Sequence, residues 1–125
     1  MSDITRRKFP RSPFLRPVCV TCREFSKICR GVEVGEGGLA FAATADIEVG
    51  TAVVINFYLS TGQFHTLKSE VRNKTEGSFA DEKIYGISFV EIPLALKRQI
   101  RSFVARSSQS SKQQPSKNLR GMNGF

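Results

Sequence analysis

Basic residues gather near the start of the sequence in a form suited to holding an anion. Residues 6–11 read Arg-Arg-Lys-Phe-Pro-Arg. Arginine side chains donate paired hydrogen bonds to phosphate and stack on flat rings. Arg7 and Arg11, four residues apart on an extended segment, could therefore hold two parts of one phosphorylated ligand. A solvated basic tail is the alternative interpretation of the same run of charge.

A glycine-rich turn at residues 33–38 is the second candidate site, with the sequence Glu-Val-Gly-Glu-Gly-Gly. Strand alternation places Glu33 and Gly35 on one outward face, with Val32 and Val34 pointing inward. A carboxylate beside bare backbone can accept hydrogen bonds from the edge of a base while the ligand approaches closely. A glycine hairpin with a surface glutamate is the alternative.

No catalytic or metal-binding set is recognisable among the other reactive residues. Cys19 and Cys22 have C-x-x-C spacing, but residues three apart on a strand point to opposite faces and cannot readily form one clamp. With Cys29 and a single histidine, His65, a four-ligand zinc site is barely assembled. His65 has no companion acid or nucleophile at a recognisable spacing. We therefore predict neither an enzyme nor a metal site.

Length and composition predict one globular domain in a reducing compartment. The chain has 125 residues, of which 40% are hydrophobic, and domains usually run about 100–150 residues. Three cysteines cannot all pair within the chain, which favours the cytoplasm. The most apolar stretch, residues 51–59, is far shorter than the roughly 20 residues of a membrane-spanning helix. The N-terminal segment lacks the apolar stretch of a secretory signal.

The net charge of +8 lies at the two ends of the sequence. Residues 1–30 carry eight basic and two acidic side chains, residues 31–96 carry four and nine, and residues 97–125 carry seven and none. A positive excess favours an anionic partner. A barrel that reads nucleic acid on its sheet would more often carry basic residues in the middle too. The charge therefore belongs to terminal segments that can fold over a ligand or meet a partner.

Period-two alternation predicts six short strands, and a helix follows them. The strands fall at residues 18–23, 28–35, 39–43, 51–59, 63–73 and 83–91, with glycine turns between several of them. After Pro93 the apolar residues recur at helical spacing, as Leu96, Ile100, Phe103 and Val104, and the helix is expected to end near Arg106. The fold class is mainly β: a small six-stranded antiparallel β-barrel with a C-terminal amphipathic helix.

Together, the arginine segment and the glycine turn resemble the PilZ domain, a bacterial receptor module for cyclic di-GMP. The family pattern is an R-x-x-x-R arm, a strand ending in D/N-x-S-x-x-G, a barrel and a helix. Arg7 to Arg11 satisfy the first motif, and residues 33–38 take the place of the second. Further matches are Gly38-Leu39, Gly50-Thr51 and Gly86-Ile87-Ser88-Phe89. The resemblance covers residues 5–106.

The second motif departs from the family at two positions. Glu33 replaces Asp or Asn, which displaces the carboxylate by one methylene, and Gly35 replaces Ser, which removes a hydroxyl. Each missing hydrogen bond costs about 0.5–1.5 kcal/mol, up to roughly a tenfold loss of affinity. The sequence thus combines an intact arm with a degenerate second motif.

The prolines near the start and the Ser/Gln/Lys-rich end divide the sequence into three expected parts, and the resemblance implies a set of ligand contacts. Residues 1–16 are a flexible basic arm, residues 17–106 the barrel with its helix, and residues 107–125 a disordered tail. The ligand is cyclic di-GMP, often an intercalated dimer, and no cofactor is expected. The contacting residues are Arg7 and Arg11 on phosphates and guanine faces, Arg6 adding positive potential, Glu33 on a guanine edge, and Gly35 and Gly38 allowing close approach.

The same resemblance implies that the arm orders on ligand binding and presents a new surface to an unidentified partner protein. Two alternatives stay open. One is an adaptor of this fold that has lost nucleotide binding and acts through protein contacts alone. The other is a small basic barrel that binds nucleic acid, which the acidic middle of the sequence argues against.

Overall fold

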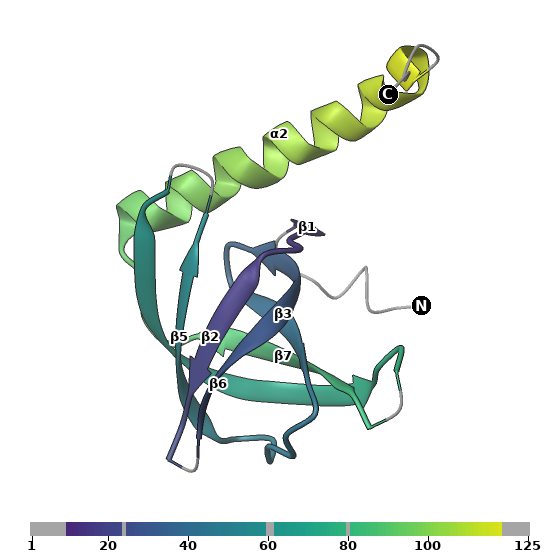
Figure 1. Cartoon of the computed structure of the whole chain (residues 1–125). Helices are drawn as coiled ribbons and strands as arrows, with labels where there is room; N and C mark the ends of the chain where they lie inside the picture. The colour runs from purple at the N-terminus through teal and green to yellow at the C-terminus, as the bar shows by residue number, and fades with distance from the viewer. Residues whose placement is uncertain (1–9, 24, 60–61, 80, 119–125) are drawn as a thin grey trace.

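The computed structural model describes residues 10–23, 25–59, 62–79 and 81–118, with side chains described as far as residue 107. These residues form seven strands and one long helix (Figure 1). The elements are β1 (Arg11–Pro13), β2 (Pro17–Thr21), β3 (Ser26–Gly35), β4 (Gly38–Ala43), β5 (Ala52–Tyr58), β6 (Phe64–Glu76), β7 (Lys83–Phe89) and α2 (Leu94–Asn118).

Six antiparallel strands close into a barrel. The sheet runs β3-β2-β5-β6-β7-β4, and β4 pairs with β3 to complete the circle. The short strand β1 pairs with residues 33–35 of β3, along the edge whose residues 26–30 pair with β2. The predicted fold class, a six-stranded antiparallel barrel with a C-terminal helix, is confirmed.

The inward faces of the strands form a continuous apolar core. On β6, Leu67 and Val71 point inward as the alternation predicts, and both are buried. Tyr85 fixes the connection after β4, because its hydroxyl donates to the Ala45 carbonyl at 2.6 Å and accepts from the Ile47 amide at 3.0 Å. The largest fully buried side chains are Tyr85, Phe14, Phe41, Phe57, Leu39, Ile55, Leu59 and Ile100.

A β-bulge interrupts β3 at Val32. Gly31 pairs with Phe41 and Glu33 with Ala40, so Val32 is an extra residue without a partner on β4. Its side chain is half-buried rather than inside the barrel. The prediction that Val32 points inward is therefore wrong, because simple alternation assumes an uninterrupted ladder. Val34 returns to the core beyond the bulge and is fully buried.

The chain segment between β1 and β2 crosses β3 at this bulge. The Phe14 amide donates to the Val32 carbonyl at 2.9 Å, and the Gly31 amide donates to the Arg16 carbonyl at 3.0 Å. A side chain at position 31 would have no room, since its Cβ would lie 2.5 Å from the Arg16 oxygen and 2.6 Å from the Phe14 oxygen. Gly31 thus allows the N-terminal segment to lie directly on the barrel.

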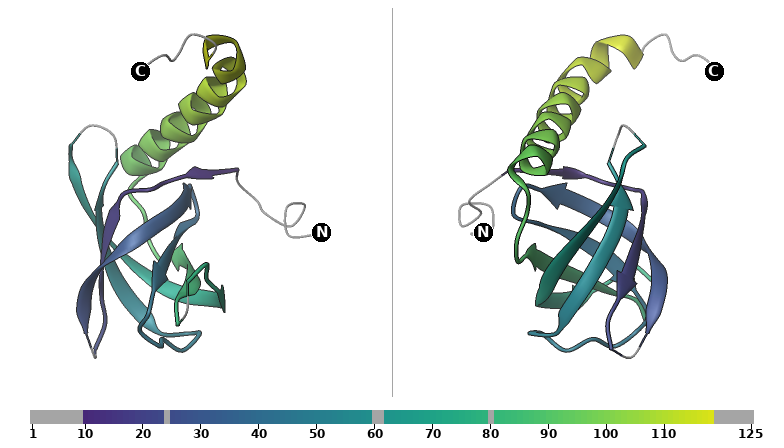
Figure 2. Two further views of the ribbon diagram at one scale, coloured as in Figure 1. Left: turned by 45° about the vertical axis from the view of Figure 1, so that its right-hand side comes forward. Right: turned by 90° about the vertical axis from the view of Figure 1, so that its left-hand side faces the viewer.

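Helix α2 lies across one end of the barrel (Figure 2). Its predicted apolar stripe is confirmed: Leu96, Ile100 and Val104 are buried, and Phe103 packs against the core. The helix continues past its predicted end near Arg106 to Asn118, so residues 107–118 are helical rather than disordered. Residues 94–114 contain neither glycine nor proline to interrupt the backbone hydrogen bonds. Figures 1 and 2 show this second half projecting beyond the barrel.

Among the described residues, no helix is both long enough and apolar enough to cross a membrane.

Candidate functional site

The two predicted motifs lie side by side in the structure. Strand β1 runs antiparallel to the end of β3, with Arg11 opposite Gly35 and Pro13 opposite Glu33. The Arg11 Nη1 atom donates to Glu33 Oε2 at 3.0 Å, and both side chains are 27% exposed. Residues 11–13, which fall within the expected flexible arm, are therefore a strand seated on the second motif. Arg6 and Arg7 lie outside the described residues.

Gly35 is covered by the same strand. A Cβ at this position would lie 2.8 Å from the Pro10 carbonyl oxygen and 3.1 Å from Arg11 Cγ. Contacts this short with backbone require the N-terminal segment to move. Glycine at position 35 therefore allows β1 to lie directly against the end of β3.

Gly38 is required by the barrel itself. Its Cβ would lie 1.9 Å from the Ile87 carbonyl oxygen and 3.0 Å from Ser88 Cα, both backbone atoms of β7. Gly38 is opposite Ser88 in the β4–β7 ladder. The close approach expected at this glycine is thus made by a neighbouring strand.

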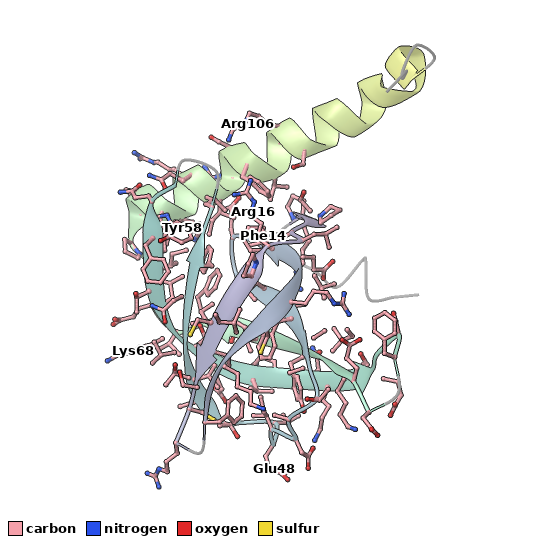
Figure 3. All side chains as sticks on the ribbon, in the orientation of Figure 1. Phe14, Arg16, Glu48, Tyr58, Lys68 and Arg106 are labelled. Atoms are coloured by element: carbon pink, nitrogen blue, oxygen red, sulfur yellow. The ribbon has the colours of Figure 1, made fainter. Side chains whose placement is uncertain are left out.

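Phe14 anchors the N-terminal segment from beneath. Its ring is 1% exposed and forms edge-to-face contacts with Phe57 of β5 at 5.7 Å and with Phe103 of α2 at 5.9 Å between ring centroids. Figure 3 shows Phe14 below α2, close to Arg16. One aromatic side chain thus joins the segment carrying Arg11 to both the barrel and the helix.

Glu36 and Arg101 form a second ion pair that the sequence analysis does not predict. Arg101 Nε donates to Glu36 Oε2 and Arg101 Nη2 to Glu36 Oε1, each at 3.0 Å. The Glu36 side chain is 8% exposed, whereas that of Arg101 is 61% exposed. The pair joins the turn between β3 and β4 to helix α2. No local pattern links two residues 65 positions apart, and the only signal is a carboxylate among glycines.

The hydrogen bonds from Arg101 lower the pKa of Glu36, and the nearby charges of Arg101 and Lys97 act in the same direction, although burial opposes them. A lowered pKa in the folded state stabilises the fold above the unfolded-state value of about 4.3, and that contribution is lost as the pH falls through the folded value.

We predict that Glu36→Gln lowers the free energy of unfolding by a constant amount above about pH 5, where the wild-type carboxylate is ionised in both states. The difference between the two proteins should narrow as the pH falls below about 4. Urea denaturation of both proteins at several pH values measures this. A difference that stays constant down to pH 2.5 would contradict the ionic contribution of Glu36.

The residues set aside as non-catalytic form no site in the described part of the chain. Cys19, Cys22 and Cys29 form no disulfide bond. No group of three His, Cys, Asp or Glu side chains there could hold a metal ion. His65 packs against Phe57 at 5.8 Å, and burial lowers the pKa of its imidazole.

These features define a small closed β-barrel module in which the strand carrying Arg11 pairs with the end of β3. The sequence model of the PilZ domain matches residues 5–106, and the chain belongs to the PilZ domain family. Its domains are non-catalytic receptors for cyclic di-GMP, which agrees with the prediction that this protein is not an enzyme.

Solved structures of other PilZ proteins share the fold. The Bacillus subtilis inhibitor of motility MotI/DgrA matches with a TM-score of 0.73 and 14% identity, over 84% of this chain and 52% of that chain. The PilZ domain with c-di-GMP of YcgR from Escherichia coli matches with a TM-score of 0.69 and 15% identity, over 90% and 98%. The K. pneumonia MrkH–c-di-GMP complex matches with a TM-score of 0.68 and 15% identity, over 87% and 55%.

The chain thus spans about half the length of two of these proteins and nearly all of the third. A comparison with proteins of curated function finds no match to the sequence.

Proposed function

We propose that this protein binds cyclic di-GMP at the junction of β1 and the turn of residues 33–38, orders its N-terminal arginine arm on binding, and signals to a partner protein. The observation that carries the proposal is the placement of Arg11 beside Glu33, with a 3.0 Å hydrogen bond between them. The two residues belong to the two ligand-binding motifs of the family and are brought together by strand pairing rather than by sequence proximity.

The charges at this junction suit an exchange of anions. In the ligand-free protein the Glu33 carboxylate accepts a hydrogen bond from one donor nitrogen of the Arg11 guanidinium. A phosphate can replace that carboxylate, because arginine presents donors in a planar fork that matches both groups. Arg7 supplies a second guanidinium and Arg6 adds positive potential. Glu33, released from Arg11, accepts hydrogen bonds from a guanine edge.

The partner protein is proposed to meet helix α2. Its sequence contains six basic residues and no acidic residue. The exposed side chains on its described part include Arg98, Arg101 and Arg106, and Figure 3 shows Arg106 on the surface of the helix. A cyclic dinucleotide at β1 does not account for this second basic region. Complementary charge favours an acidic surface on the partner.

Calorimetric titration of the full chain with cyclic di-GMP tests the proposal. Saturable heat is expected at micromolar ligand. No heat at high micromolar ligand would overturn nucleotide binding and favour the second function, an adaptor of the same fold. That alternative is supported by Gly35, which lacks the family's hydroxyl. Steeply salt-dependent binding to arbitrary DNA would instead favour the nucleic-acid-binding barrel.

Restoring the family motif should strengthen binding. We predict that Glu33→Asp combined with Gly35→Ser tightens cyclic di-GMP binding by about tenfold, because each regained hydrogen bond is worth about 0.5–1.5 kcal/mol. The added serine Cβ meets the Pro10 oxygen at 2.8 Å, so β1 must move outward in the ligand-free variant. Calorimetry measures the affinity, and faster tryptic cleavage after Arg11 reports the displaced strand. Unchanged affinity would count against the placement of Glu33 and Gly35 at the ligand.

A further inference from the structure

We propose that Arg101 is a positioning residue for the ligand site: through Glu36 it fixes the turn of residues 33–38, so that ligand binding and docking of α2 on the barrel are coupled. This inference rests on the proposed function for its ligand-binding consequence. The coupling itself is a property of the ligand-free protein and can be tested without nucleotide.

The turn needs an external support. Three of its six residues are glycines, which allow many backbone conformations. Its two ends are held by strand pairing, Gly35 to Arg11 and Gly38 to Ser88. Between those ends, the Glu36 carboxylate receives both donors of the Arg101 fork, each at 3.0 Å. A two-point bond of this kind fixes orientation as well as distance.

The same helical turn also supports the other half of the site. Phe103, two residues after Arg101 on α2, packs edge-to-face on Phe14. Phe14 directly follows strand β1, which carries Arg11. One segment of α2 therefore contacts the arm through Phe103 and the turn through Arg101. A shift of this segment changes the relative position of Arg11 and Glu33.

The exposure of Arg101 makes the bond accessible to a partner. Its side chain is 61% exposed although it binds a carboxylate that is 8% exposed. An acidic group on a partner protein can therefore reach the guanidinium and compete with Glu36. Coupling between sites is reciprocal. Nucleotide that fixes the turn strengthens docking of α2. A partner that withdraws Arg101 from Glu36 weakens nucleotide binding by the same factor by which nucleotide weakens binding of that partner.

The test compares Arg101→Ala with Arg98→Ala, which removes an exposed arginine three residues earlier on the same helix. By calorimetry, Arg101→Ala should weaken cyclic di-GMP binding about tenfold, within the usual range for coupled sites, and Arg98→Ala should change it less than twofold. Arg101→Lys should restore part of the affinity, since it keeps the charge but not the fork. Glu36→Gln should reproduce the loss. Equal affinities for Arg101→Ala and Arg98→Ala would overturn the proposal.

Amide hydrogen exchange of the ligand-free variants separates this inference from the proposed function. Arg101→Ala should speed exchange at residues 33–38 and 11–14 while residues 96–104 keep their protection, and Arg98→Ala should leave all three regions unchanged. If wild-type protein gives no heat with cyclic di-GMP, the proposed function fails, but altered exchange in Arg101→Ala still supports the coupling. Unaltered exchange at residues 33–38 would contradict it whatever the nucleotide does.

Discussion

Replacing Arg11 by alanine is expected to weaken cyclic di-GMP binding about 10- to 150-fold. A hydrogen bond to a charged group contributes about 1.5–3 kcal/mol, and Arg11 is paired with Glu33 of the second motif. The change also removes the cation that faces the Glu33 carboxylate, which adds negative charge to the proposed ligand site. Both effects act against the ligand, so the loss should exceed that of a surface charge.

Arg16→Ala is the matched control for this experiment. Arg16 is exposed, lies five residues further along the same segment, and interacts with Gly31 through its backbone carbonyl, which the change preserves. Calorimetry should find its affinity within about threefold of wild type, the change expected when only a distant screened charge is removed. Equal losses in the two variants would show that Arg11 acts only through net charge.

Adding Glu33→Gln to Arg11→Ala should weaken binding further, since Glu33 is the proposed acceptor for a guanine edge. Contacting residues commonly show interaction energies of 0.5–3 kcal/mol, which a double-mutant cycle measures. If Arg11→Ala with Glu33→Gln binds more tightly than Arg11→Ala alone, Glu33 repels the phosphates and does not accept a guanine edge.

Replacing Gly38 by alanine is expected to destabilise the fold by about 3 kcal/mol or more, the upper range for added volume in a well-packed interior. The new Cβ would lie 1.9 Å from the Ile87 carbonyl oxygen, and its other close neighbours are also β7 backbone atoms. Backbone atoms in a paired strand cannot turn aside. The barrel can accept the methyl group only by separating β4 from β7.

Gly86→Ala provides the comparison, because Gly86 lies on β7 opposite Ala40 in the same ladder. Its added Cβ meets side-chain atoms of Asn73 at 2.7–3.1 Å, and a side chain can rotate away. Urea denaturation should therefore give a clearly smaller loss for Gly86→Ala than for Gly38→Ala. Similar losses for both would mean that the cost comes from glycine flexibility and not from the backbone contact.

The sequence predicts the features of this protein that depend on neighbouring residues. Alternation locates all six barrel strands, and helical spacing locates the stripe of Leu96, Ile100 and Val104. Alternation does not predict the bulge at Val32, because the extra residue is defined only by how β3 pairs with β4. Strand β1 is not predicted either, because it is a short segment between prolines and its partner, β3, is brought beside it only in the folded barrel.

The candidate site also has one part that the sequence predicts and one part that only the folded structure shows. Arg11 and Glu33 are assigned to one site because their motifs occur in the order of a known family, and the structure then places them in contact. The support from Glu36 and Arg101 depends on how α2 crosses the barrel end, which no spacing in the sequence specifies. Charge alone would assign Arg11 and Arg101 to separate solvated surfaces.

The projecting half of α2 amplifies any rotation of the docked half. Its docked residues, around Arg101 and Phe103, form the pivot, and the helix continues to Asn118. At a rise of about 1.5 Å per residue, that length is roughly 25 Å. A rotation of about 10° at the pivot, equivalent to a small adjustment of side-chain packing, displaces the far end by about 4 Å over this length. A small change of packing at the docked residues therefore moves the end of the helix by several ångströms.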